Sequence, residues 1–255
     1  MKTAVKRVLS LIGYNHHSAS EMGMNAVRSS DTFIVSYPKS GNTWVRFLLA
    51  NAMRPERVAT FHDLDSFVPD LHKCRARVDH SASPRFIKTH HAYCGKYPRF
   101  IYICRDGRDV MVSFYHFERD RFKGSFSEFI RSRNTHVFGQ WHWHEHVSAA
   151  LIEAKARPRN VLFIRFEDFL AKPLQVSSRI IKFCSIDVSE SVIEEVSDRC
   201  LFHRLQEIEK TYGGSDVDLF MRKGSSNQWI EYFSNDDIEY FHEQAGETLK
   251  LAGYF

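Results

Sequence analysis

A short buried run that ends at a proline and leads into a glycine-containing turn is the feature that most limits how this chain can fold. Residues 32–37 (TFIVSY) are mostly β-branched or aromatic and are bounded by Pro38, which predicts a buried strand meeting a turn. Beyond the turn, side chains recur at helical spacing at Trp44, Phe47, Leu48 and Asn51. The segment therefore predicts a strand, a loop and the start of a helix.

The same alternation of strands and helices repeats downstream. Further strands are expected at 86–89, 100–104 and 161–165. Helices are expected at 108–119 and 141–156, in the stretch that follows the last strand and runs to Phe183, at 189–196, and from Ser234 onward. Strands that alternate with helices indicate an α/β fold whose parallel sheet is covered by helices on both faces. We expect a P-loop-like, three-layer sandwich.

The length of the chain favours a single domain over residues 1–255. Its 255 residues, 43% of them hydrophobic, are enough to bury one substantial core. We expect an N-terminal helix and loop at 1–31, a core at about 32–233 and a C-terminal helix at 234–255. Ser234 and Asp237 resemble a capping box at the start of that last helix. Residues 212–218 (YGGSDVD) predict a mobile loop or lid.

Charge and cysteine content exclude several classes of partner. A formal net charge of +4 is too weak to favour nucleic acid, but it suits a small polyanionic ligand. Five widely spaced cysteines without a C-x-x-C pair predict neither a disulfide framework nor a zinc site, which fits the cytoplasm. No apolar run is long enough for a transmembrane segment. Residues 5–12 form a short basic amphipathic pattern, interpreted as a packed first helix, with attachment to anionic lipid as the alternative.

The turn at residues 37–44 (YPKSGNTW) has the composition of a phosphate-binding loop. A glycine lets main-chain N–H groups approach a phosphate, Lys39 adds a positive charge, and the following helix presents its unpaired N–H donors. The loop is not a Walker A motif, because the lysine precedes the glycine. An ordinary strand-to-helix turn is the alternative, since Pro, Ser, Gly and Asn are common there.

In this segment the chain resembles the cytosolic-type sulfotransferases that use 3′-phosphoadenosine 5′-phosphosulfate (PAPS), whose loop reads Y-P-K-[SA]-G-[TN]-T-W. The resemblance implies that Lys39 contacts the bridging oxygen of the donor. It also implies that Trp44 stacks beside the adenine and that the 5′-phosphate is held by Ser40, Gly41, Asn42 and Thr43. The product would be adenosine 3′,5′-bisphosphate (PAP), and the family requires no metal.

A second anion site is then expected for the 3′-phosphate of the donor. Arg105 follows the strand at 100–104 and Ser113 lies on the next helix, and an arginine fork with a hydroxyl suits a phosphate. Both match the family's 3′-phosphate motif. We interpret Arg108 and Asp109, within the same motif, as an ion pair at the helix start.

Two later segments resemble the family less completely. Its closing element R-K-G corresponds to Arg222, Lys223 and Gly224, although the glycine and lysine that follow in the family are Asn227 and Ile230 here. The resemblance also places Phe202 beside the adenine. Phe166 stands where the family commonly has a tyrosine that bonds the adenine.

The strand at 86–89 leads into two adjacent histidines, His90 and His91. Sulfuryl transfer to a hydroxyl needs a base, for which imidazole is suited, and the ends of parallel strands are where ligands gather. By their residue type both histidines are candidates, and either can instead be structural. The family's K-T-H motif selects His90 as the base and implies that Lys88 is a second charge near the transferred group.

The histidine-rich run at 141–146 (WHWHEH) offers another site. His142 and His146 lie one helical turn apart, but the H-E-x-x-H motif is absent and packing or pocket lining explains the run better than a metal. The family lines its acceptor pocket at the positions of Phe114, Tyr115, Phe117, Trp141 and Trp143. The acceptor is therefore expected to be a small molecule, a lipid or a carbohydrate.

Two other functions remain possible from the sequence. A nucleotide kinase-like phosphotransferase shares the strand, loop and helix, but it requires the missing Walker A glycine. An inert nucleotide-binding protein of the same fold requires neither Lys39 nor His90. No family dimer motif is evident, so the sequence leaves the oligomeric state open.

Overall fold

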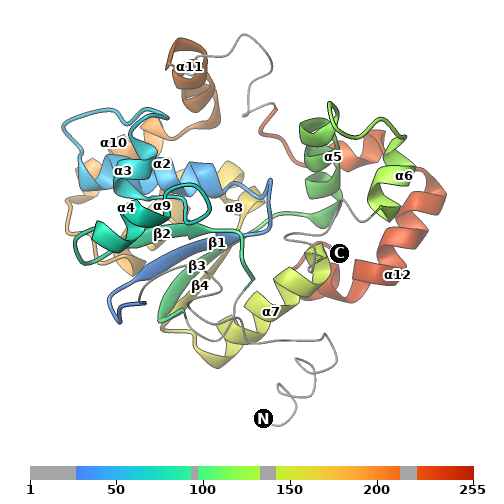
Figure 1. The fold of residues 1–255 in the computed structure, drawn as a ribbon, viewed down its shortest axis with the longest axis horizontal. Helices are drawn as coiled ribbons and strands as arrows, with labels where there is room; N and C mark the ends of the chain where they lie inside the picture. Colours follow the sequence, from blue (N-terminus) through green and yellow to red (C-terminus); the bar gives the residue numbers. More distant parts are fainter. Residues whose placement is uncertain (1–26, 93–96, 133–141, 213–222) are drawn as a thin grey trace.

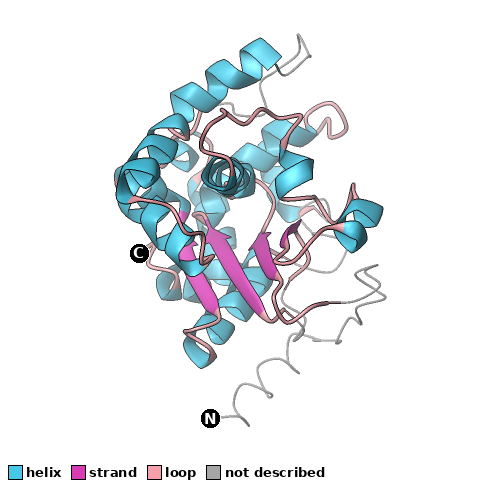
Figure 2. Ribbon diagram, turned by 90° about the vertical axis from the view of Figure 1, so that its left-hand side faces the viewer, coloured by secondary structure: helices cyan, strands magenta, loops and turns pink. Residues whose placement is uncertain are grey.

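A parallel four-stranded sheet lies at the centre of the computed structural model, which describes residues 27–92, 97–132, 142–212 and 223–255 (Figure 1). The strands are β1 (Thr32–Ser36), β2 (Phe86–Thr89), β3 (Arg99–Cys104) and β4 (Val161–Arg165), in the order β2-β1-β3-β4. All three pairings are parallel, with Phe33 opposite Ile87 on one side and Phe100 on the other. The strands lie side by side in Figure 2.

The helices of the described residues connect and cover these strands. They are α2 (Asn42–Met53), α3 (Leu64–Phe67), α4 (Arg75–His80), α5 (Gly107–Glu118), α6 (Phe126–Arg131), α7 (Trp143–Ala156), α8 (Phe166–Ala171), α9 (Pro173–Phe183), α10 (Glu190–Arg199), α11 (Phe202–Tyr212) and α12 (Asn235–Leu251), with a 3-10 turn η2 at Gln228–Glu231. In Figure 1, α5, α6, α7 and α12 lie to one side of the sheet, and α2, α3, α9 and α10 lie to the other.

Both faces of the sheet are buried, as the residues of β1 show. Phe33 and Val35 belong to the core formed with α5, α7 and α12, whereas Ile34 belongs to the core formed with α2, α9 and α10. Successive side chains of a strand point to opposite faces, so an uninterrupted apolar strand requires a helical layer on each side. The predicted α/β class with helices on both faces is confirmed.

Most element bounds agree with the sequence expectations, and the differences have local causes. Strands β2 and β4 occupy the expected residues, and the capping box of Ser234 with Asp237 is present. Helices α3, α4 and α6 were not expected because four to six residues are too few to show a helical period. Of the expected loop at 212–218 only Tyr212 is described, as the end of α11, and the expected N-terminal helix lies outside the described residues.

The strand order determines where a ligand site can form. From β1 the chain moves outward to β2 on one side and then returns to β3 on the other, so the connections that leave β1 and β3 diverge. Open parallel sheets bind ligands at the carboxyl ends of strands where this divergence leaves a crevice. The phosphate-loop candidate follows β1, His90 follows β2 and Arg105 follows β3, which brings all three to one edge.

A buried ion pair sets the opposite edge of the sheet. Arg85 donates from Nε to Asp31 Oδ1 (2.8 Å) and from Nη2 to Asp31 Oδ2 (2.6 Å), and both side chains are almost fully buried. These residues immediately precede β2 and β1, so the pair aligns the two strands where they begin. Among the described helices, none is both long and apolar enough to cross a membrane.

Candidate active site

A cavity of about 510 Å³ lies at the carboxyl edge of the sheet. Its wall includes most of the residues singled out from the sequence, namely Lys39, Gly41, Asn42, Thr43, Trp44, Lys88, His90, Arg105, Ser113, Phe202, Lys223 and Gly224. Ser40 does not line it but is buried within the loop, and Arg222 lies outside the described residues. Segments nearly 190 residues apart in sequence, from Lys39 to Gly224, therefore meet around one space.

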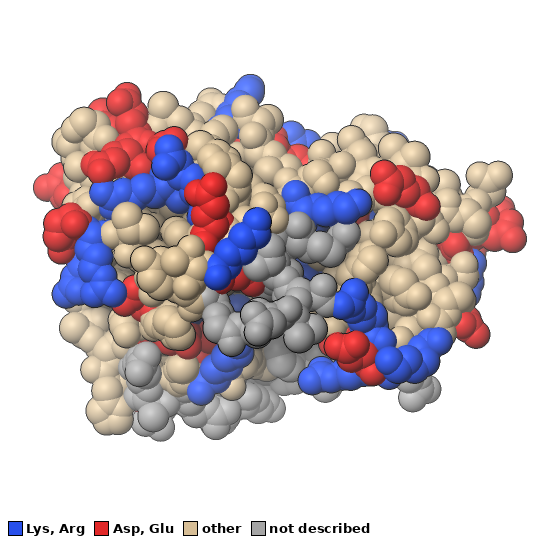
Figure 3. Space-filling view, turned by 90° about the horizontal axis from the view of Figure 1, so that it is seen from above, with Lys and Arg blue, Asp and Glu red and all other residues tan. Residues whose placement is uncertain are grey.

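The described wall of this cavity carries an excess of positive charge. Six Lys or Arg side chains line it against two carboxylates, those of Asp70 and Glu118. On the face seen in Figure 3, basic and acidic side chains are interspersed. Concentrating like charges on one concave wall is favourable only when an anion binds there, so the cavity suits a polyanionic ligand.

The loop after β1 has the backbone geometry of an anion-binding turn. Lys39 and Gly41 have positive φ angles of 66° and 99°, in the left-handed region that lets neighbouring N–H groups converge on one point. A Cβ on Gly41 would lie 2.7 Å from Cδ2 of Phe166, so only glycine fits. The Asn42 side chain donates to the carbonyl of Ile34 and to Ser36 Oγ (both 3.2 Å), which fixes the helix start against β1.

Two buried donors of this loop have no hydrogen-bond partner among the described residues. They are the hydroxyl of Ser40 and the indole Nε1 of Trp44, and no side chain caps the first turn of α2. Leaving a buried donor unsatisfied costs about 1–3 kcal/mol of free energy, so such donors usually form a hydrogen bond to a ligand or to water. Their position at a helix N-terminus favours an anion.

Arg105 joins the loop after β1 to the late loop near residue 225. Its guanidinium donates to the carbonyl of Lys39 (3.2 Å) and to that of Ser225 (3.0 Å), and it lies over the ring of Phe166 at 4.7 Å. The side chain is almost completely buried yet reaches the cavity wall. One arginine thus orders two binding loops and still faces the space between them.

The late loop is held down by Asp109. Its carboxylate accepts the main-chain N–H groups of Asn227 (2.8 Å) and Trp229 (3.0 Å). Burial raises the pKa of this carboxyl group, partly offset by Arg105 and by the two N–H donors. The expected ion pair between Arg108 and Asp109 is therefore wrong.

Arg108 instead pairs with Asp106, two residues earlier, at 2.6 Å. Its guanidinium also lies over the Trp229 ring at 4.0 Å and donates to the carbonyl of Tyr254. The physical reason is that Asp106 caps the start of α5 and faces back toward Arg108, whereas Asp109 points from the helix to the late loop.

Gly224 is the second position where a side chain cannot be accommodated. Its φ angle is 58°, and a Cβ would lie 2.2 Å from the ring of Phe202, which lines the same cavity. Gly224→Ala is expected to raise the dissociation constant for PAP about tenfold, because left-handed strain alone costs about 1–3 kcal/mol and the ring must move. Isothermal titration measures this change.

Gly246→Ala is the matched control for that substitution. Gly246 lies within α12, and its nearest neighbour to an added Cβ is His242 at 3.8 Å. Alanine stabilises a helix interior relative to glycine, so PAP affinity should be unchanged and the melting temperature should not fall. Equal PAP affinity for both variants would contradict the role assigned to Gly224.

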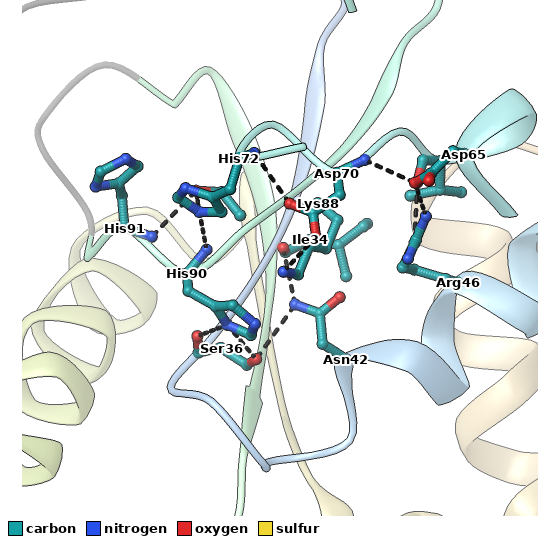
Figure 4. Close-up of polar contacts among 12 residues, drawn as sticks. Ile34, Ser36, Asn42, Arg46, Asp65, Asp70, His72, Lys88, His90 and His91 are labelled. Carbon is teal, nitrogen blue, oxygen red and sulfur yellow. Dashed lines mark hydrogen bonds and ion pairs between the residues drawn. The ribbon is translucent and has the colours of Figure 1, made fainter. Parts of the chain in front are cut away.

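His90 is anchored at its ring, its N–H and its carbonyl. Its carbonyl accepts from His146 Nε2 (3.0 Å). Its main-chain N–H donates to His72 Nε2 (3.0 Å), and its Nδ1 donates to the carbonyl of Ser36 (2.8 Å) (Figure 4). A carbonyl only accepts, so the proton of the neutral ring is on Nδ1 and the lone pair is on Nε2. Burial and then the charge of Lys88 hold the pKa of His90 well below 6.5.

His91 has a different environment. Its main-chain N–H donates to Thr89 Oγ1, its ring lies against that of His72 at 4.7 Å, and it is not part of the described cavity wall. Of the two histidine candidates, His90 is the one that faces the cavity.

The histidine-rich run serves the packing of α7. His146 is buried, and its Nδ1 accepts from the hydroxyl of Tyr102 (2.7 Å) while its Nε2 donates to the carbonyl of His90. Burial lowers the pKa of His146 to about 4. His142 lies at the start of α7, where its main-chain N–H donates to Glu145, and the described residues contain no cluster of His, Cys or acidic side chains suited to a metal.

Lys88 forms an ion pair in the cavity wall. Its Nζ lies 2.9 Å from Asp70 Oδ2, and burial lowers the pKa of the lysine. Asp70 belongs to a segment that pairs with β2 beside Lys88, at a parallel bridge outside the named strands. Asp70 was not expected at the site, because no motif or period marks residues 68–73.

Other wall residues also escaped the sequence analysis. They are Arg46, His72, Lys73, Glu118 and Gln228, which lie in segments without a recognisable motif. Of the expected acceptor-pocket aromatics, Phe114 and Phe117 do line the cavity, and Lys39 Nζ lies 4.3 Å from the centre of the Phe117 ring. Phe166 lines it as well.

The remaining acceptor-pocket aromatics lie elsewhere. Tyr115 packs among Phe122, Phe126 and Phe129, and Trp143 is buried with its Nε1 donating to the carbonyl of Arg105. Trp141 lies outside the described residues. Trp143 therefore supports the backbone of Arg105 and does not face the described cavity.

Comparison with known proteins identifies the family. The sequence profile of the sulfotransferase domain matches residues 29–253, which includes every described wall residue of the cavity. This chain belongs to the sulfotransferase domain family. Cytosolic sulfotransferase 1 of Danio rerio is 25% identical over 96% of this chain and 91% of its own length. A flavonol sulfotransferase-like protein of Flaveria bidentis is 27% identical over 88% and 83%.

Solved structures show the same sulfotransferase fold. Mouse sulfotransferase SULT7A1, complexed with PAP, matches with a TM-score of 0.70 and 25% identity over 91% of this chain and 87% of its own. Retinol dehydratase in complex with retinol and PAP matches with a TM-score of 0.70, at 22% identity over 88% and 82%. Membership of the sulfotransferase family makes the chain an enzyme of the sulfuryl-transfer class.

Proposed function

We propose that this sulfotransferase moves a sulfuryl group from PAPS to a hydroxyl, or an amine, of a small acceptor. The observation that supports this most is the single cavity that unites Lys39, His90 and Arg105 from the ends of three adjacent strands. The relatives solved in complex with PAP support the choice of nucleotide. The matching span also supports treating residues 1–255 as one domain.

The residues present fit a doubly phosphorylated adenosine. The donors at Ser40, Gly41, Asn42 and Thr43 would hold the 5′-phosphate, which satisfies the buried hydroxyl of Ser40. Arg105, Ser113, Lys223 and Gly224 would hold the 3′-phosphate, with Arg222 from the adjoining undescribed segment.

The adenine would lie between apolar rings. Trp44, Phe166 and Phe202 all line the cavity, with Trp44 in edge contact with Phe166 and Phe202 beside Gly224. Since Phe166 replaces a hydroxyl-bearing ring of the family, it can offer only apolar contact there.

The chemistry assigned to this chain is an in-line displacement at sulfur. His90 Nε2 takes the proton of the acceptor hydroxyl, the acceptor oxygen forms a bond to sulfur, and the bond from sulfur to the 5′-phosphate oxygen breaks. The electron pair of that bond stays on the phosphate oxygen, where Lys39 stabilises the added negative charge, with Lys88 as a second cation. PAP and the sulfated acceptor leave, and the imidazolium returns its proton to solvent.

The setting of the reaction follows from the same relatives. Retinol dehydratase was solved with androsterone and with retinol, and another relative is a cytosolic sulfotransferase, which supports a small acceptor and a cytoplasmic location for this chain. We assign no role to nucleic acid or to a metal ion, because the cavity residues suit a nucleotide phosphate without either.

Titration calorimetry tests the assigned nucleotide. The protein is expected to bind PAP with a dissociation constant in the micromolar range or lower. ATP with magnesium should bind at least tenfold more weakly, because ATP lacks the 3′-phosphate that Arg105 and Ser113 would bind. Adenosine 5′-monophosphate is the matched control for adenine binding alone. A preference for ATP would instead support the kinase-like alternative.

Transfer itself separates an enzyme from an inert binding protein. Incubation with ³⁵S-labelled PAPS and a panel of hydroxyl acceptors should yield labelled product. PAP binding without transfer to any acceptor would favour the inert protein of the same fold.

A further inference from the structure

The part of the cavity wall that the nucleotide leaves uncovered is largely charged. Once the residues assigned to PAPS are set aside, the described wall that remains with His90 consists of Arg46, Asp70, His72, Lys73, Lys88, Glu118 and Gln228, with Pro38, Phe114 and Phe117 as its apolar members. A pocket for a flat apolar alcohol would be lined mainly by apolar side chains. The acceptor side of this cavity is therefore built for a polar molecule.

Asp70 is the buried carboxylate of this wall. Only 4% of the residue is exposed, and its oxygens are positioned by Lys88 Nζ at Oδ2 (2.9 Å) and by the main-chain N–H of His72 at Oδ1 (3.0 Å) (Figure 4). Although burial opposes it, Lys88 and these hydrogen bonds lower the pKa of Asp70. At neutral pH the group is an ionised acceptor with lone pairs left over, since each carboxylate oxygen accepts two hydrogen bonds.

Asp70 also belongs to the structure that holds the base. Asp70 accepts the main-chain N–H of His72, and His72 Nε2 in turn accepts the main-chain N–H of His90. The rings of His72 and His90 are nearly parallel, with their centres 6.2 Å apart. The carboxylate therefore keeps a set position relative to His90. Both side chains line the same cavity, so one acceptor can contact His90 and Asp70 together.

We propose that Asp70 determines acceptor specificity by accepting a hydrogen bond from a second hydroxyl next to the one that is sulfated. The acceptor class is then a polyol or sugar with neighbouring hydroxyls, its apolar part against Phe114 and Phe117. An acceptor without that hydroxyl displaces the water bound to a buried carboxylate but donates no hydrogen bond in its place. Leaving a buried polar group unpaired in this way discriminates strongly between acceptors. This inference rests on the proposed sulfuryl transfer.

A pair of acceptors that differ by one hydroxyl tests it. With PAPS as donor, kcat/KM for 3-phenoxypropane-1,2-diol should exceed that for 3-phenoxypropan-1-ol by about 10- to 100-fold, the range of one hydrogen bond to a charged group. Asp70→Asn should reduce this ratio to about threefold or less, because the neutral amide accepts more weakly and has lost its pairing with Lys88. The ratio is the readout, so a general loss of rate does not affect it.

Asp63→Asn is the matched control. Asp63 is a carboxylate seven residues earlier that pairs with Arg57 at 2.6 Å, and neither residue is part of the described cavity wall, so this variant should keep the wild-type ratio. PAP affinity measured in parallel reports whether each variant retains a folded donor site.

The outcomes separate the two proposals. A wild-type ratio near one, or a ratio that Asp70→Asn leaves intact, overturns the specificity inference while transfer to either alcohol upholds the sulfotransferase assignment. PAP binding with no sulfation of the diol also overturns the inference. Absence of both PAP binding and transfer overturns the proposed function and this inference with it.

Discussion

His90→Ala is expected to lower kcat by about 10²- to 10⁴-fold, the usual contribution of a positioned general base. The ring is held by the carbonyl of Ser36 at Nδ1, so its Nε2 carries the lone pair that, in the proposed mechanism, takes the acceptor proton. Alanine removes the base but leaves the loops that would bind the nucleotide. Initial-rate kinetics with labelled PAPS, together with PAP titration, measures both effects.

His91→Ala is the matched control, because it removes an adjacent imidazole that does not line the described cavity. Its kcat should stay within about threefold of wild type, as for substitutions away from the reacting groups. Full activity of His90→Ala on every acceptor would show that another group acts as the base.

The pH profile offers a second view of the same residue. Because burial holds the pKa of His90 below 6.5, the neutral ring that can accept a proton persists as the solution is acidified through that value. The acid limb of kcat/KM is therefore expected below pH 6.5, and it should disappear in His90→Ala. An acid limb above pH 7 would contradict the neutral, buried ring.

Asp31→Ala is expected to destabilise the protein by about 3–5 kcal/mol, the cost of leaving the partner of a buried ion pair uncompensated. Arg85 loses both of its contacts to the carboxylate and remains almost fully buried. The pair stands where β1 and β2 begin, so its loss also loosens the alignment that brings Ser36 to His90. Chemical denaturation followed by circular dichroism measures the free energy of unfolding.

Glu190→Ala provides the comparison for an exposed pair. Glu190 contacts Lys182 at 3.0 Å, but both side chains are more than 60% exposed, and such pairs contribute about 0–1 kcal/mol. A loss of less than about 1 kcal/mol for Asp31→Ala would mean that the buried pair is worth no more than a surface one.

The sequence predicted the sheet well because a buried parallel strand has a strong local signal. Residues 86–89 and 161–165 are apolar or β-branched runs between polar turns, and both are strands within the expected bounds. The turn at 37–44 was recognisable for a similar reason, since its glycine and lysine stand directly between a strand and a helix. Both the fold class and the phosphate-loop candidate could therefore be predicted from local sequence patterns.

Contacts between distant segments could not be predicted in this way. Asp70 pairs with Lys88 only because an irregular segment runs beside β2, and nothing near residue 70 marks that pairing. His146 reaches the carbonyl of His90 from a helix 56 residues away, so its role depends on the packing of α7. Arg108 pairs with Asp106 and not with the adjacent Asp109, because Asp109 accepts hydrogen bonds from the late loop more than 100 residues on.

The bridging position of Arg105 makes the two ends of the nucleotide site thermodynamically coupled. One guanidinium supports the main chain of both Lys39 and Ser225, so displacement of either loop changes the hydrogen bonds offered to the other. Free-energy changes from substitutions in the two loops should consequently fail to add, with Arg105 carrying the interaction term. We therefore expect a phosphate bound at one loop to change the affinity of the other loop for its own phosphate.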